Sequence, residues 1–189
     1  MTSPQTHHAD HFHAVQFYRD AVSLADVACT FISEALTRGE PGLMIAMREH
    51  AEFFRNALPL KGVDVEVSLA SGLLTLLDAE ETLSKFTQGG VPMAEPFTAT
   101  LTPVLSGIAA KFPGSTIRAY GEMVDVLWRR DQTSAIRLEV LWNNLAQSHD
   151  FALLCAYSVG NFYKASTTAD ICAQHSHVIT ETGSAVRLT

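Results

Sequence analysis

Short apolar runs alternate along the chain with longer segments in which apolar residues recur every three or four positions. The longer period is clear in segment 22–38, whereas segment 150–159 is a nearly continuous apolar run. The first pattern is typical of an amphipathic helix and the second of a strand covered on both faces. Strands are predicted over 13–18, 42–47, 72–78, 115–123 and 150–159, with weaker ones over 63–69 and 177–181. Helices are predicted over 22–38, 48–58, 94–112, 124–130, 133–147 and 166–175. This alternation predicts an α/β fold with a largely parallel sheet.

The chain of 189 residues contains no internal repeat and no linker rich in Pro, Gly or Ser. We therefore expect one α/β domain over residues 12–181. The first eleven residues are polar and include His7, His8 and His11. Because chain ends of this composition are usually poorly ordered, we expect a flexible tail over 1–11 and a second tail over 182–189.

Charge and cysteine content narrow the class of protein. Thirteen Lys and Arg residues against twenty Asp and Glu residues give a net charge of −7, and the basic residues are scattered. Direct binding to nucleic acid needs clustered basic residues, so we do not expect it. No apolar run reaches the length of a membrane span, and the polar start does not resemble a secretory signal. Three widely spaced cysteines favour reduced thiols in a cytoplasmic protein.

Common catalytic and nucleotide motifs are absent from the sequence. It contains no GxxxxGK[ST] or GxGxxG phosphate loop and no GxSxG nucleophile motif. Cys155 lies inside a strand predicted to be buried, where a thiol is usually an apolar filler. We therefore expect the protein not to be an enzyme, and the sequence does not identify a cofactor.

Polar residues follow two of the predicted strands, where parallel sheets usually bind their ligands. One group contains Arg118, Tyr120 and Glu122, and the other contains Tyr157 and Asn161. Together with neighbouring apolar side chains, these residues could form a pocket with apolar walls and a few orienting hydrogen-bond groups. Equally, Arg118 could pair with Glu122, or with Glu139 on the neighbouring helix, as part of the scaffold.

A metal site is a second hypothesis, because imidazole groups are common metal ligands. His13 differs from the preceding histidines in that it belongs to a predicted strand, and His175 and His177 lie near the chain's last predicted strand. His13 could bind a metal ion together with His175 or His177. Alternatively, the two C-terminal histidines could be capping or surface groups.

Several short motifs occur in an order and spacing that resemble the MEDS domain, a sensory domain named for methanogens and a methylotroph regulator. They are HAVQFYRD, FISEALTRGEPGLMIA, LLTLLDAEETL, IRAYGEMVDVLW, RLEVLWNNL and FALLCAYSVGNF, between about residues 10 and 180. By this resemblance His13, Phe17 and Tyr18 match the opening His-x-x-x-Phe-Tyr motif. Residues 121–123 match the family's GEM element, and Glu139 matches an acidic residue on the next helix.

The resemblance implies a three-layer α/β sandwich related to RecA and KaiC, with a degenerate nucleotide site that lacks the phosphate loop. It also implies the sensing of small molecules such as hydrocarbon derivatives. Since 189 residues leave no room for an output domain beside the sensor, we expect signalling through a separate protein, such as a histidine kinase, an anti-sigma factor or a transcription regulator, or through homodimer formation.

The resulting hypothesis is a sensory module that binds a small, largely apolar molecule. The predicted ligand-binding residues are His13, Phe17, Tyr18, Arg118, Glu122, Met123 and Tyr157. A metal-dependent sensor using His13 with His175 or His177, and a nucleotide-binding protein of the RecA/KaiC type, are the alternatives.

Overall fold

The structure is a computed structural model that describes residues 11–162 and 167–188. The first half of the chain contains β1 (His13–Tyr18), α1 (Ala21–Leu36), β2 (Gly42–Ala46), α2 (Arg48–Ala57), a 3-10 turn (Pro59–Lys61), α3 (Val65–Ser71), β3 (Leu74–Asp78), α4 (Ala79–Ser84), β4 (Thr87–Gln88) and β5 (Val91–Pro92). The second half contains α5 (Ala94–Lys111), β6 (Ile117–Gly121), α6 (Met123–Trp128), α7 (Gln132–Leu145), β7 (Phe151–Ser158), a 3-10 turn (Val159–Asn161), α8 (Thr167–Cys172), β8 (His177–Ile179) and β9 (Ala185–Arg187).

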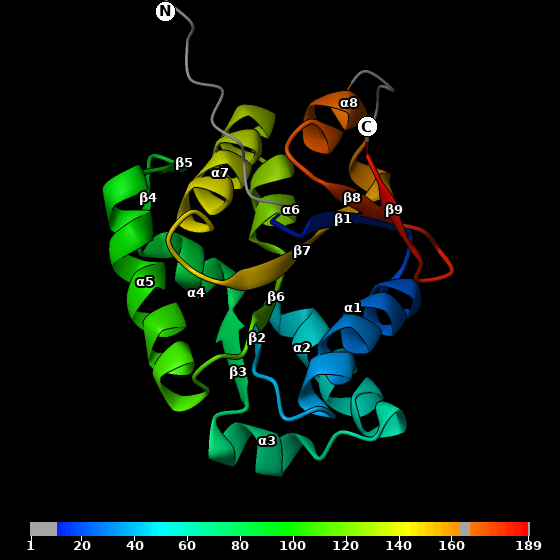
Figure 1. Ribbon diagram of the computed structural model, residues 1–189. Helices are drawn as coiled ribbons and strands as arrows, with labels where there is room; N and C mark the ends of the chain where they lie inside the picture. Colours follow the sequence, from blue (N-terminus) through cyan, green and yellow to red (C-terminus); the bar gives the residue numbers. More distant parts are fainter. Residues whose placement is uncertain (1–10, 163–166, 189) are drawn as a thin grey trace, which may run out of the picture.

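Seven strands form one sheet in the order β3-β2-β6-β7-β1-β8-β9, and only the last pair is antiparallel. Helices α1, α2 and α3 cover one face of this sheet, while α4, α5, α6 and α7 cover the other (Figure 1). Successive residues of a strand point to opposite faces. Val15 of β1 therefore packs into the core under α5 and α7, whereas Ala14 packs into the core under α1. The predicted three-layer α/β sandwich is confirmed.

Aspartate side chains cap the N-termini of α1, α3, α4 and α7. Asp20 caps α1 by accepting a hydrogen bond from the backbone N–H of Ser23, and Asp131 caps α7 in the same way. The capped helix α7 carries Glu139, which is buried in the core.

Segment 63–69 was predicted as a weak strand, and that prediction is wrong. The chain forms the helix α3 there, capped by the side chain of Asp64 and ended by Gly72, whose φ is 76°. Its buried residues, Val65 and Ser68, are three positions apart, which is helical spacing. The valines at alternate positions imitate a strand, but the caps at both ends favour a helical turn.

The predicted domain boundaries, residues 12 and 181, leave out residues that belong to the fold. Residues 185–187 form strand β9 beyond the predicted boundary at residue 181. His11, which was assigned to the N-terminal tail, packs its ring edge-on against Phe151 at 5.0 Å, and burial lowers its pKa to about 4. The rest of the predicted tail, including His7 and His8, lies outside the described residues.

Candidate functional site

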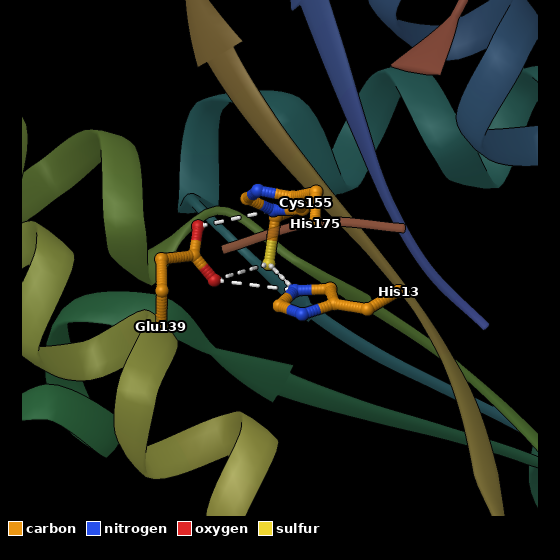
Figure 2. A group of neighbouring side chains, drawn as sticks. All are labelled: His13, Glu139, Cys155 and His175. Atoms are coloured by element: carbon orange, nitrogen blue, oxygen red, sulfur yellow. Dashed lines mark hydrogen bonds and ion pairs between the residues drawn. The ribbon is translucent and has the colours of Figure 1, made fainter. Parts of the chain in front are cut away.

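A cluster of four polar side chains lies inside the core between the sheet and α7. His13 comes from β1, Cys155 from β7, Glu139 from α7 and His175 from the connection between α8 and β8 (Figure 2). His13 Nε2 lies 3.2 Å from Glu139 Oε2, and His175 Nε2 lies 3.4 Å from Glu139 Oε1. Cys155 Sγ lies 3.4 Å from both His13 Nε2 and Glu139 Oε2. All four residues are buried. We call this set the His-Glu-Cys cluster.

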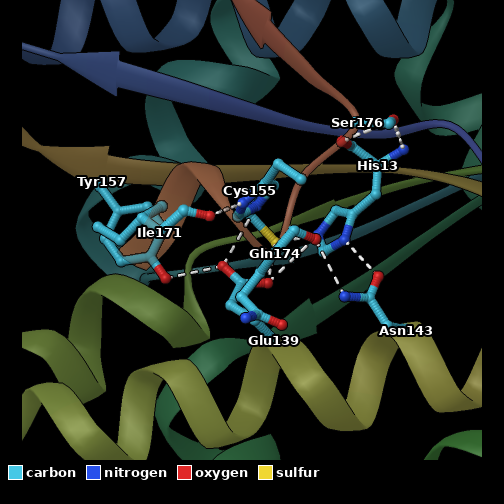
Figure 3. Close-up of polar contacts among 9 residues, drawn as sticks. His13, Glu139, Asn143, Cys155, Tyr157, Ile171, Gln174 and Ser176 are labelled. Carbon is cyan, nitrogen blue, oxygen red and sulfur yellow. Dashed lines mark hydrogen bonds and ion pairs between the residues drawn. The ribbon is translucent and has the colours of Figure 1, made fainter. Parts of the chain in front are cut away.

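Surrounding hydrogen bonds hold each member in position (Figure 3). His13 Nδ1 lies 2.8 Å from Asn143 Oδ1, and the amide nitrogen of Asn143 donates to the carbonyl of Gln174. His175 Nδ1 lies 2.7 Å from the carbonyl oxygen of Ile171. Since both partner atoms are acceptors, each imidazole carries a proton on Nδ1 and directs Nε2 into the cluster.

The carboxylate of Glu139 is the centre of the cluster. Burial by itself would raise its pKa, but the charge and hydrogen bonding of His175 and His13 bring the pKa of Glu139 well below its usual range. The hydroxyl of Tyr157 donates a hydrogen bond of 2.7 Å to Oε1. Burial and the nearby Glu139 raise the pKa of Cys155 well above that of an ordinary thiol. The cluster therefore pairs an ionised carboxylate with a protonated thiol.

The four groups that meet here are of the types that bind first-row divalent metal ions. Two imidazole nitrogens, one carboxylate and one thiol have donor atoms within 4.8 Å of one another. Among the residues that the structure describes, these four form the one group of this kind. His177 is not part of it, since its ring stacks on Phe12 and its Nδ1 contacts the hydroxyl of Ser176. Of the two histidine pairs in the metal hypothesis, the structure therefore brings together His13 and His175.

The predicted residues Tyr18 and Glu122 lie at the carboxyl ends of their strands, but in separate hydrogen-bond networks. Tyr18 donates its hydroxyl to the buried carboxylate of Asp125 at 3.1 Å. Glu122 accepts hydrogen bonds from the backbone of Met47 and the hydroxyl of Tyr120, and its Oε2 lies 3.0 Å from His50 Nδ1. Each carboxylate has its hydrogen-bonding capacity taken up by protein groups, which indicates a role in the scaffold.

Three further predicted residues lie in apolar surroundings or beside the cluster. Met123 is the buried first residue of α6, and Phe17 packs edge-on against Phe162 at 5.6 Å. Tyr157 is buried and directed at Glu139 rather than at a ligand pocket. Phe17 also lies within 6.3 Å of the Tyr157 ring centre, so an aromatic group adjoins the cluster.

Arg118 lies at the opposite end of the sheet from its predicted place. It is the second residue of β6 and pairs with Gly42 and Ala152, which lie at the starts of their strands. It pairs neither with Glu122 nor with Glu139. Its Nη1 donates to Glu34 Oε2 at 2.7 Å and to the carbonyl oxygen of Phe31 at 2.8 Å. The prediction that Arg118 joins a pocket at the carboxyl ends is therefore wrong.

Arg118 does, however, line a pocket of about 330 Å³ between α1 and the sheet. We call it the α1 pocket. Its walls are mainly apolar and include Phe12, Phe31, Leu154 and Ile179, while Gly183 and Ala185 of the β8–β9 hairpin close one side. A second depression, beside α2 and α3, is lined by charged groups such as Arg55, Asp64 and Glu66. The α1 pocket combines apolar walls with a few polar groups, among them Arg118 and its partner Glu34, as small-molecule sites usually do.

Sequence reasoning missed Cys155 as a member of the cluster and Asn143 as the partner that orients His13. Cys155 was interpreted as an apolar filler because it lies inside a strand predicted to be buried. The contact between Cys155 and His13 exists because β7 lies beside β1, with Val15 opposite Cys155 in the register. An i,i+4 pair of polar residues, Glu139 and Asn143, on an otherwise apolar helix face was the available signal.

The connection between β1 and α1 bears on the nucleotide-binding alternative. Only Arg19 and Asp20 join these two elements. A phosphate loop of the Walker type uses the motif GxxxxGK[ST], whose glycines let the backbone surround the phosphates and whose last residues begin the helix. Here Asp20 also places a carboxylate at the start of α1, where a phosphate would otherwise sit. The predicted degenerate nucleotide site agrees with this short connection.

Comparisons with solved structures show the fold. An uncharacterised protein of Pyrococcus horikoshii, solved in complex with an unknown peptide, superposes with a TM-score of 0.67 at 11% identity, over 89% of this chain and 76% of that chain. A KaiC-like protein of Pyrococcus horikoshii gives 0.60 at 12% identity, over 89% and 69%. The flagellar accessory protein FlaH of Methanocaldococcus jannaschii gives 0.52 at 11% identity, over 93% and 74%. The fold is therefore of the RecA/KaiC type.

The sequence comparisons address the family. No curated protein matches the chain. None of the described helices is both long enough and apolar enough to cross a membrane. The model of the MEDS family, described as the methanogen/methylotroph, DcmR sensory domain, matches residues 12–176. The chain belongs to the MEDS family of sensory domains.

Proposed function

We propose that this sensory domain binds a small, largely apolar molecule with one acidic group in the α1 pocket and signals through a separate protein. The observation that carries the proposal is the pocket of about 330 Å³ with Arg118 in its wall. That volume lies in the range of small-molecule sites. In this function the domain binds its ligand and does not catalyse a reaction.

The ion pair of Arg118 can be exchanged for a ligand carboxylate at little cost. Its partner Glu34 has a side chain that is 54% exposed, whereas the side chain of Arg118 is 22% exposed. Pairs with an exposed member contribute only about 0–1 kcal/mol. A ligand carboxylate could therefore displace Glu34 into solvent and take over the contact with Arg118, whose guanidinium also lies 5.0 Å from the centre of the Phe31 ring.

The β8–β9 hairpin is the element through which binding could be transmitted. Ile179, Gly183 and Ala185 contribute to the pocket, and residues 185–187 are exposed. β9 lies at the edge of the sheet and contacts only β8 among the strands. A ligand that packs against this hairpin would shift its population of conformations and so change its affinity for a partner. We propose a histidine kinase, an anti-sigma factor or a transcription regulator as that partner, or a second copy of the chain.

Titration calorimetry with butanoate, hexanoate, octanoate and the corresponding primary alcohols tests the binding step. We expect affinity to rise with chain length, because each buried methylene contributes about 0.8 kcal/mol. Arg118→Gln should weaken binding of the acids by roughly 10-fold to 100-fold and leave the alcohols unchanged, since only the acids use the cation.

Two further variants locate the site. Ala152→Leu places extra side-chain volume in the pocket and should weaken the binding of acids and alcohols alike. Tyr157→Phe is the matched control, because Tyr157 contacts Glu139 on the opposite face of the sheet. If Ala152→Leu binds octanoate as tightly as wild type and the Tyr157→Phe control do, the α1 pocket is not the site.

Hydrogen exchange of residues 177–187 should slow on octanoate binding if the hairpin transmits the signal.

A further inference from the structure

We infer that the His-Glu-Cys cluster is a metal site, in which His13, Glu139, Cys155 and His175 bind one divalent ion, zinc by preference, in a tetrahedron. The donor set of two imidazoles, one carboxylate and one thiolate suits zinc better than the oxygen-loving ions magnesium and calcium. This inference is independent of the ligand proposed for the α1 pocket, which lies on the other face of the sheet.

The distances within the cluster fit a tetrahedral ion. Zinc bonds of about 2.0 Å to nitrogen or oxygen and about 2.3 Å to sulfur place neighbouring donor atoms about 3.3–3.8 Å apart. The contacts of His13 Nε2 with Glu139 and Cys155 measure 3.2 and 3.4 Å. The contact of His175 Nε2 with Glu139 measures 3.4 Å. All donor atoms lie within 4.8 Å of one another, so the wider pairs would have to close by up to about 1.5 Å to bind one ion.

The Nδ1 atoms of His13 and His175 are already hydrogen-bonded, as the second ring nitrogen of a histidine ligand usually is in metal sites. Histidine ligands usually donate their second ring N–H to a carbonyl or carboxylate, which fixes the tautomer and the ring orientation. His13 uses the side-chain carbonyl of Asn143, and His175 uses the backbone carbonyl of Ile171. Tyr157 in the same way orients the carboxylate of Glu139.

His175 provides a second observation. Its buried Nε2 points into the cluster and lies 3.4 Å from Glu139 Oε1, which is longer than the roughly 2.7–2.9 Å of a strong charge-assisted hydrogen bond. The contact therefore satisfies this buried nitrogen only weakly. A metal ion at the centre of the cluster would give it a short bond.

The negative charges of the donor groups also balance the charge of a divalent ion. The carboxylate of Glu139 and the thiolate of Cys155 carry two negative charges between them, and two neutral imidazoles add none. A divalent ion would leave the buried site without net charge, which avoids the large cost of an uncompensated charge in the core. Metal binding replaces the S–H bond of Cys155 by a metal–sulfur bond and releases that proton to solvent.

With four protein ligands, the ion has no open position for a substrate, which makes the site structural or regulatory rather than catalytic. His175 lies two residues before β8, and the neighbouring Ser176 is hydrogen-bonded to the backbone of His13. The ion would therefore fasten the segment that leads into the β8–β9 hairpin to β1 and α7.

The test uses the full untagged chain after removal of metal with a chelator. A His7→Gln, His8→Gln background removes the two histidines nearest the N-terminus, which could otherwise bind metal by themselves. Zinc and cobalt are then titrated separately. We expect one ion per chain, and for cobalt a thiolate-to-metal charge-transfer band together with the strong visible absorption of a tetrahedral site. In calorimetry with buffers of different protonation enthalpy, at least one proton should be released per ion.

Cys155→Ser and Cys29→Ser are matched variants, because both thiols are fully buried, on opposite faces of the sheet. Cys155→Ser should abolish the charge-transfer band and weaken zinc binding roughly 100-fold or more, whereas Cys29→Ser should change neither. Asn143→Ala should weaken zinc binding about 10-fold to 100-fold by freeing the ring of His13.

The titration of the His7→Gln, His8→Gln chain with its cluster intact decides the matter even if a cluster variant fails to fold. Failure of this chain to take up zinc or cobalt would overturn the inference. So would uptake without a charge-transfer band, or a band that Cys29→Ser abolishes. None of these three results bears on octanoate binding in the α1 pocket, which is measured separately.

Discussion

The Nε2 atom of His13 lies 3.2 Å from Oε2 of Glu139, and both side chains are buried. The two residues are 126 positions apart in sequence. The contact joins the first strand of the sheet to a helix on one of its faces, and it draws Cys155 and His175 into the same group. Removal of one partner should therefore have consequences well beyond a single hydrogen bond.

Glu139→Gln keeps the shape of the side chain and removes its charge. We expect the free energy of unfolding, measured in urea with a chelator present, to fall by about 3–5 kcal/mol, because one partner of a buried charged network is lost. The control is Glu80→Gln, which removes a carboxylate from an exposed pair with Arg130. That change should cost about 1 kcal/mol or less. Equal effects of the two substitutions would show that the metal-free cluster does not depend on the Glu139 charge.

His50 should make stability depend on pH. Burial lowers its pKa, but the hydrogen bond and negative charge of Glu122 outweigh burial, so the pKa of His50 is raised above 6.5. Protonated His50 therefore stabilises the folded state fully below about pH 6.5, and this contribution is lost as pH rises through the folded pKa. We expect wild type to exceed His50→Gln in free energy of unfolding by more at about pH 5.5 than at about pH 9. A difference that grows with pH would contradict the pairing with Glu122.

Tyr18 should act in the scaffold and not in ligand binding. Its hydroxyl donates to the buried carboxylate of Asp125, which also accepts hydrogen bonds from the backbone of Ser158 and from Asn161. Tyr18→Phe should lower the free energy of unfolding by about 1–2 kcal/mol. The affinity for octanoate should stay that of wild type, because Tyr18 ends β1 whereas Arg118 lies near the start of β6. A loss of octanoate affinity without a loss of stability would restore Tyr18 as a ligand-binding residue.

Asp131 should hold the start of α7 and so the position of Glu139. Its carboxylate accepts hydrogen bonds from the backbone N–H groups of Thr133 and Ser134. Asp131→Ala should lower the free energy of unfolding by about 1 kcal/mol, whereas Asp131→Asn, which can still cap the helix, should change it by only a few tenths. Thermal unfolding of the two variants side by side measures this difference. Identical losses would show that capping is not the role of Asp131.

Local patterns in the sequence predict most of the architecture. The apolar runs at 13–18 and 150–159 and the helical spacing in 22–38 depend only on residues close together in the chain, and each matches an observed element. The wrong strand prediction at 63–69 has a local cause as well, because the helix cap at Asp64 outweighed the alternating valines. The MEDS resemblance, carried by the order of the motifs, is confirmed over residues 12–176.

Tertiary structure decided which distant side chains meet. The sequence places Cys155 in a buried strand, but only the sheet order puts β7 beside β1 and so brings its thiol to His13. Packing of α1 against the start of β6 likewise brings Glu34 to Arg118, so that Arg118 pairs with Glu34 and not with Glu122. A strand's own residues define its two faces but not its neighbours. Those neighbours depend on the packing of the whole sheet, and here that packing formed both the α1 pocket and the His-Glu-Cys cluster.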